Sequence, residues 1–241
     1  MARPLELRAN ALQCLLETDP GAKLVQVAAM AAAFVDGAWE LDSGAVLDVA
    51  GTIPGRPARP CLVPPRLLGR RSMVTVEGRA MLVHALAHIE FNALNLALDA
   101  LWRFGDMPPE YYADWLRVSK EEAEHFAMLA AHLQLLGYQY GDFSGHDSLW
   151  EMVEKTRGDV VARMALVPRT LEARGLDAIP SLRAKLAQAG DLAAAAILDR
   201  ILDDEIGHVL KGPFNLVARR LAGFTEPELA HLQSVQAASG R

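Results

Sequence analysis

The stretch VSKEEAEHF (118–126) carries Glu122 and His125 three residues apart, and the later stretch DDEIGH repeats this spacing with Glu205 and His208. Residues three apart on an α-helix share a face, so each pair presents a carboxylate beside an imidazole. Such a pair can bind a divalent metal ion through an oxygen and a nitrogen. Each stretch therefore predicts a helix with one metal-binding face.

A single glutamate precedes each pair at nearly the same distance. Glu90 lies 32 residues before the first pair, and Glu172 lies 33 residues before the second. Glu90 also falls on the apolar face of its helix, where a carboxylate without a cation would cost more than the ~2–7 kcal/mol of an unpaired polar group. Two helical hairpins would bring four carboxylates and two imidazoles to one point, the ligand set of di-iron and di-manganese bundles. We therefore predict a metal centre whose ligands are Glu90, Glu122, His125, Glu172, Glu205 and His208.

The spacing Glu-x-x-His is not specific by itself. Glu228 and His231 share it, but Glu228 also completes a capping box with Thr225, so we assign this pair to the surface. The alternative to a metal centre is a buried salt-bridge network. Such a network requires Arg or Lys on the same core faces, and the sequence pattern places none there.

Two further acids stand directly before the ligand pairs. We expect Asp204 to orient His125 and Glu121 to orient His208, because a metal-bound histidine usually donates its other N–H to a carboxylate or carbonyl. The alternatives are that Glu121 faces solvent and that Asp204 pairs with a nearby arginine.

Helical periodicity dominates the chain and predicts an all-α fold. The second and third long helices are joined by a long connection, which is typical of a bundle of two antiparallel pairs. Pro168 is expected to kink the third helix. The four long helices are predicted at ~77–104, ~106–137, ~147–174 and ~190–222, with a shorter one at ~179–188.

The chain around this bundle divides into an N-terminal and a C-terminal part. Residues 1–75 comprise two helices, at ~4–18 and ~20–34, and a strap at 51–72 with five prolines and five arginines. We expect the strap to cross the bundle surface and pair with its acids; a phosphate or nucleic-acid contact is the alternative. The bundle is assigned to residues 76–223 and a C-terminal helix and tail to residues 224–241.

Composition limits the class of protein. The net charge of −6 argues against a general nucleic-acid binder. Cys14 and Cys61 form no C-x-x-C pair, and no signal peptide or stretch of 18 uncharged apolar residues is apparent. We therefore expect a cytoplasmic protein that does not span a membrane.

Several runs of the sequence resemble the bacterial ferritin-like family DUF455 over roughly residues 50–220. These runs are PGRPARP, HALAHIEFNALNLALDA, EEAEHF, YGDFSGHDSLWEM, RMALVPRTLEARGLD and DEIGHV. The resemblance implies a ferritin-like four-helix bundle and the six ligands above, but no reaction. The run at Glu205 also resembles bacterial multicomponent monooxygenases and ribonucleotide reductase small subunits, which have Asp where this chain has Glu121. A tRNA hydroxylase is similar in architecture only.

A centre of this kind predicts two iron ions, or iron and manganese, and dioxygen as a partner. We expect an O2-activating hydroxylase or oxidase of an unknown organic substrate, with electrons from a separate reductase. The alternatives are a ferroxidase or metal-storage protein, a tRNA-modifying hydroxylase by analogy of fold, and a scaffold that has kept the ligands. Assembly size separates storage from catalysis, since storage requires a closed cage. An oligomer and an RNA contact are both compatible with the sequence.

Overall fold

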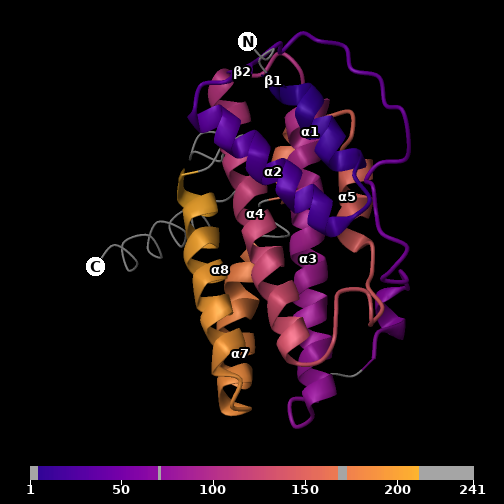
Figure 1. Cartoon of the computed structure of the whole chain (residues 1–241), viewed down its shortest axis with the longest axis vertical. Helices are drawn as coiled ribbons and strands as arrows, with labels where there is room; N and C mark the ends of the chain where they lie inside the picture. The colour runs from indigo at the N-terminus through magenta and orange to yellow at the C-terminus, as the bar shows by residue number, and fades with distance from the viewer. Residues whose placement is uncertain (1–4, 70–71, 168–172, 212–241) are drawn as a thin grey trace. The chain divides into compact units, whose positions relative to one another are not determined.

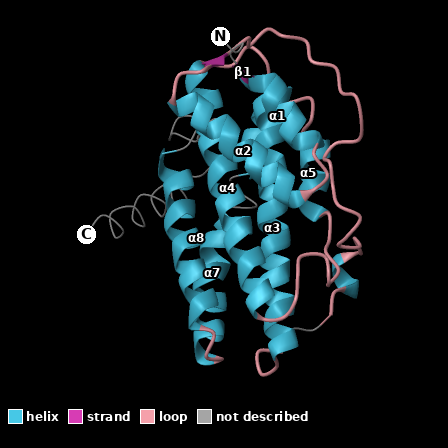
Figure 2. Cartoon of the chain, viewed as in Figure 1, coloured by secondary structure: helices cyan, strands magenta, loops and turns pink. Residues whose placement is uncertain are grey.

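The computed structural model describes residues 5–69, 72–167 and 173–211. These residues are mostly helical, with two short strands, so the all-α prediction is confirmed (Figure 2). The chain forms two compact units, each described by itself. The first comprises residues 1–71 and 76–150, and the second comprises residues 72–75 and 151–241.

Four helices build the first unit. They are α1 (Leu7–Leu16), α2 (Pro20–Val35), α3 (Val76–Arg103) and α4 (Pro109–Leu135). In Figure 1, α3 and α4 run side by side and α2 crosses α4. The start of α2 follows from local sequence, because Asp19 Oδ1 accepts the Ala22 N–H and Pro20 occupies the first turn. Pro109 opens α4 in the same way.

The core of the first unit lies between α3 and α4, with α1 packed on α3. Leu94, Leu98 and Leu101 of α3 and Leu129 and Leu133 of α4 are fully buried. Among the described residues, α3 is the one helix long and apolar enough to cross a membrane, but its apolar window is 78% buried. Such burial is typical of the core helix of a soluble protein.

Irregular chain completes the first unit. Strands β1 (Leu5–Glu6) and β2 (Trp39–Glu40) pair in parallel, and the described part of the strap includes a short 3-10 helix, η1 (Pro65–Leu67). The strap follows the helices: the Gly55 N–H donates to Leu15 O at 2.7 Å, and Arg56 pairs with Asp147 at 2.5 Å. This last contact agrees with the expectation that strap arginines pair with acids of the bundle.

Helices α5 to α8 follow, and α5 begins in the first unit. They are α5 (Ser148–Lys155), α6 (Val160–Val167), α7 (Ala173–Gln188) and α8 (Leu192–Lys211). Within the second unit, α7 and α8 form a hairpin through Gly190, whose φ of +82° favours glycine. Asp191 caps α8 by accepting the Ala194 N–H, and Arg183 and Asp199 join the two helices at 3.0 Å.

The predicted third helix, ~147–174, is wrong as a continuous element. In the structure, α5 ends at Lys155 and a separate helix, α6, begins at Val160. The physical reason lies in the intervening residues, because Asp159 Oδ1 accepts the N–H groups of Val161 and Ala162 and so starts a new helix. Helix α7 contains the shorter helix predicted at ~179–188.

Some predicted features lie outside the described residues. These are Pro168, Glu172, the part of the fourth predicted helix that follows Lys211, and the C-terminal segment 224–241, which contains Glu228 and His231. The side chain of His208 also lies outside the description.

Candidate metal centre

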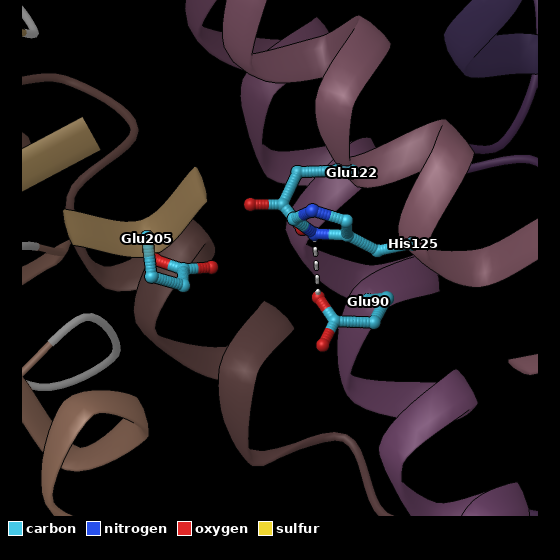
Figure 3. A group of neighbouring side chains, drawn as sticks. All are labelled: Glu90, Glu122, His125 and Glu205. Atoms are coloured by element: carbon cyan, nitrogen blue, oxygen red, sulfur yellow. Dashed lines mark ion pairs between the residues drawn. The ribbon is translucent and has the colours of Figure 1, made fainter. Parts of the chain in front are cut away.

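Two neighbouring helices place three of the predicted ligands together. Glu90 extends from α3, while Glu122 and His125 extend from successive turns of α4 (Figure 3). The exposed fractions are 7%, 4% and 0%, respectively. The apolar faces of the two helices pack against each other. The three polar side chains lie on these faces and are therefore buried in the core.

The separations within this group match a shared ion. His125 Nδ1 lies 3.5 Å from Glu122 Oε2 and 3.9 Å from Glu90 Oε2. Two atoms bound to one divalent ion at about 2.1 Å each lie no more than about 4.2 Å apart, so both separations fit a common ion. One ligand atom from each of the three side chains lies within 4.8 Å of the others. The group can therefore hold a metal ion.

The chemistry of the donors is consistent with this geometry. Two carboxylates and one imidazole form a hard, oxygen-rich set that suits iron and manganese. Buried carboxylates strongly favour a nearby cation because burial penalises their charged form. A divalent ion would balance both charges and would keep His125 neutral, since only an unprotonated ring nitrogen can bind a metal.

The other predicted ligands belong to the second half of the chain. Glu205 is buried on α8, in the second unit, and is the fourth side chain drawn in Figure 3. His208 follows it on α8 by three residues, so their backbones occupy the predicted helical spacing. Glu172 lies outside the described residues. The six-residue ligand set therefore remains a prediction.

The two acids expected to orient the histidines make ion pairs on their own helices. Glu121 lies 3.3 Å from Arg117, and Asp204 lies 2.7 Å from Arg200. Both pairs have the i, i+4 spacing of a helix face. The pair at Asp204 corresponds to the arginine alternative, while a role for either acid beside a histidine remains a prediction.

One cation of the second unit lies in its interior. Arg163 of α6, on the segment predicted as the third long helix, is fully buried. Its Nε donates to Thr156 Oγ1 at 2.7 Å and its guanidinium also donates to Val153 O at 2.8 Å. These two hydrogen bonds are to neutral groups and bridge the break between α5 and α6.

Histidines earlier on α3 have other roles. His88 Nε2 lies 3.0 Å from His146 O and 3.1 Å from Asn92 Nδ2, and His88 Nδ1 forms a hydrogen bond with the Tyr140 hydroxyl at 2.9 Å. His84 Nε2 accepts the Gly141 N–H. Burial lowers the pKa of His88 and raises that of Tyr140. These histidines therefore hold the long connection after α4.

Sequence reasoning missed two residues near the ligands. The Tyr140 ring packs against Phe91 and Phe126, the residues that follow Glu90 and His125. Lys23 is fully buried, and its Nζ lies 5.0 Å from the Phe91 ring centre. Lys23 had a detectable signal, because it is the one charged residue in an otherwise uncharged helix. Tyr140 had none, since its position depends on the path of a loop.

The comparisons with known proteins agree with the resemblance seen in the sequence. The family model described as "Protein of unknown function (DUF455)" matches residues 16–213. An uncharacterised protein of Haemophilus influenzae is 46% identical, with 75% of this chain and 76% of that protein covered. No solved structure matches the chain.

Proposed function

The chain belongs to the DUF455 family of proteins of unknown function, and that family description names no reaction, so we infer the chemistry from the buried Glu and His side chains. We propose that the protein is ferritin-like and holds two iron ions, or iron and manganese. In this proposal the metal centre activates dioxygen to oxidise an organic substrate. The observation that carries this proposal is the burial of Glu90, Glu122 and His125 at separations that fit a shared ion.

The proposed centre has two halves of the same design. Glu90, Glu122 and His125 supply one half from α3 and α4. Glu205 and His208 on α8 supply the other, with Glu172 from the segment between α6 and α7. The supporting observations are that Glu205 is buried and that α8 is helical through both positions. Four carboxylates then offset the charge of two divalent ions.

The bound ions would supply the binding and reduction of dioxygen. The residues of the chain fix the ligands and exclude water. Phe91 and Phe126 pack together beside the ligand-bearing turns, with ring centres 5.2 Å apart, and Leu94 fills the next turn of α3. A dry, apolar surround strengthens the electrostatic hold of the carboxylates and limits side reactions with water. Electrons would come from a separate reductase.

The N-terminal part of the chain favours catalysis over simple storage. Helix α1 packs on α3 and α2 packs on α4, so these extra helices cover the pair that carries the ligands. A storage protein needs only the bundle and a closed cage. We therefore rank an oxidase or hydroxylase above iron storage.

Metal analysis tests the centre. Protein purified from cells that were grown with added iron should contain about two metal ions per chain. The double variant Glu122→Ala, Glu205→Ala should lose most of this metal. Glu124→Ala is the matched control, because Glu124 is exposed on the same helix and pairs with Lys120; Glu228→Ala is a second control. Full metal content in the double variant would refute the proposed centre.

Oxygen consumption tests the reaction. The protein loaded with ferrous iron should consume dioxygen repeatedly when a chemical reductant is supplied. A single turnover followed by accumulation of many iron ions in a large assembly would instead establish storage.

A further inference from the structure

Lys23 is the one charged residue of α2, and its side chain is buried in the first unit. Its Nζ lies 2.5 Å from Asn95 Oδ1, 3.1 Å from Gly55 O and 3.4 Å from Leu15 O. All three partners are neutral oxygen atoms, so these contacts satisfy donors of the ammonium group without balancing its charge. A buried charge acts on other charged groups over a longer range than a charge in water, because the protein interior screens it less.

The ammonium group faces the part of α3 that carries Glu90. Its Nζ lies 5.0 Å from the centre of the Phe91 ring, and Phe91 follows Glu90 in the chain. Phe91 packs in turn on Phe126, which follows His125, with ring centres 5.2 Å apart. Glu90 and Asn95 are five residues apart on α3, which is about 7.5 Å along the helix axis at about 1.5 Å per residue. A pair of aromatic rings therefore connects the ammonium group to the turns that carry two candidate ligands.

We propose that Lys23 raises the reduction potential of the metal centre, because its ammonium group favours the reduced ions. This inference rests on the proposed function and names a residue that regulates the same site. Reduction lowers the positive charge of the centre, so a cation buried nearby stabilises the reduced ions relative to the oxidised ones. A unit charge about 10 Å away, at an effective dielectric constant of about 20, shifts a one-electron equilibrium by roughly tenfold.

The charge of Lys23 changes near neutral pH. Burial lowers the pKa of its ammonium group from 10.5 to about 7. The coupling between the two sites is reciprocal, so an electron that enters the centre also raises the affinity of Nζ for a proton. In the balanced step, one electron passes from the reductase to the metal ions and a proton passes from water to Nζ. Reduction of the centre is therefore coupled to proton uptake at Lys23.

The other titratable groups around Lys23 keep their charge near neutral pH. Cys14 and Glu17 act on it from α1, and Arg56 acts on it from the strap. Burial raises the pKa of the Cys14 thiol to about 12, and the hydrogen bond from the Asp19 N–H lowers the pKa of the Glu17 carboxyl. A guanidinium group stays protonated over this range, and α3 contributes an amide and a phenyl ring, which are neutral. Among these described residues, Lys23 is therefore the group whose charge changes between pH 6 and pH 9.

Redox titration of the full chain loaded with iron tests this proposal. At pH 6, Lys23→Met should lower the midpoint potential by about 59 mV, which is a tenfold change in a one-electron equilibrium. At pH 9 the wild type has lost the proton, so the two potentials should agree. Lys23→Arg keeps a cation at both pH values, so its potential should exceed that of Lys23→Met by a similar amount at pH 6 and pH 9. Lys120→Met is the matched control, because it removes an exposed cation of α4 that solvent screens, and it should leave the potential unchanged.

Three results would overturn the role of Lys23 and leave the metal centre in place. The first is equal potentials of the wild type and Lys23→Met at pH 6, with full metal content in both. The second is a Lys23→Arg protein whose potential depends on pH as the wild type's does, and this result decides the question if Lys23→Met fails to fold. The third is an equal loss of potential in Lys120→Met. A wild-type protein that binds no iron would instead refute the proposed centre and this role with it, so metal analysis of the same samples separates the two failures.

Discussion

Lys23 Nζ lies 2.5 Å from Asn95 Oδ1, and neither side chain is exposed to solvent. The same ammonium group donates to Gly55 O at 3.1 Å and faces the ring of Phe91. One buried lysine therefore joins α2, the strap and α3. Because Phe91 follows Glu90, this contact also supports the turn of α3 that carries a proposed ligand.

Replacement of Lys23 tests how much this junction stabilises the first unit. Lys23→Met keeps the length and apolar stem of the side chain but removes the donor, which leaves buried acceptors at Gly55 and Asn95. We expect the free energy of unfolding to fall by about 1–3 kcal/mol, measured by urea denaturation. Lys120→Met, at an exposed ion pair on α4, should change it by less than ~1 kcal/mol. Equal effects at the two positions would contradict the role assigned to Lys23.

The same lysine predicts a pH dependence of stability. Burial lowers the pKa of Lys23 from 10.5 to about 7 in the folded protein. Between these values the unfolded chain binds a proton that the folded chain does not, so stability rises with pH. Below about pH 7 both states are protonated and the contribution is constant.

Denaturation at several pH values checks the sign. From pH 7.5 to 9.5 the wild type should gain about 1.4 kcal/mol per pH unit relative to Lys23→Met. If the free energies of unfolding of the two proteins change in parallel with pH, the Lys23 ammonium group keeps its proton in the folded state.

Arg163 provides a test of the junction between α5 and α6. Its hydrogen bonds to Thr156 and Val153 bridge the break between α5 and α6. We expect Arg163→Met to lower the free energy of unfolding by about 2 kcal/mol, or roughly 4–8 °C in Tm, measured by thermal circular dichroism. Metal content should be unchanged. An unchanged melting temperature would contradict the role assigned to Arg163 at this junction.

Short-range chemistry explains most of what could be predicted about the helices. The start of α2 depends on Asp19 and Pro20, which are neighbours in sequence, and the proline at the start of α4 acts over the same range. The break before α6 also has a local cause in Asp159. It escaped prediction because the apolar periodicity continues across it, and periodicity does not distinguish one helix from two short ones.

The candidate ligand residues were predicted for a different reason. A buried carboxylate on an apolar stripe is costly, so Glu90 stands out from the stripe that surrounds it. The i, i+3 spacing of Glu122 and His125 follows from helix geometry alone. The distance from His125 to Glu90, however, is a property of two helices packed together.

The sequence by itself determined the helical class, the approximate helix limits and the residues whose chemistry suits a metal, because each depends on periodicity, caps and charge within a few turns. Only the tertiary structure decided that Lys23 would meet Asn95, that Tyr140 would pack on Phe91 and that α2 would expose a neutral face. Those outcomes depend on contacts between residues far apart in the chain, and side-chain packing selects them only after the helices have formed.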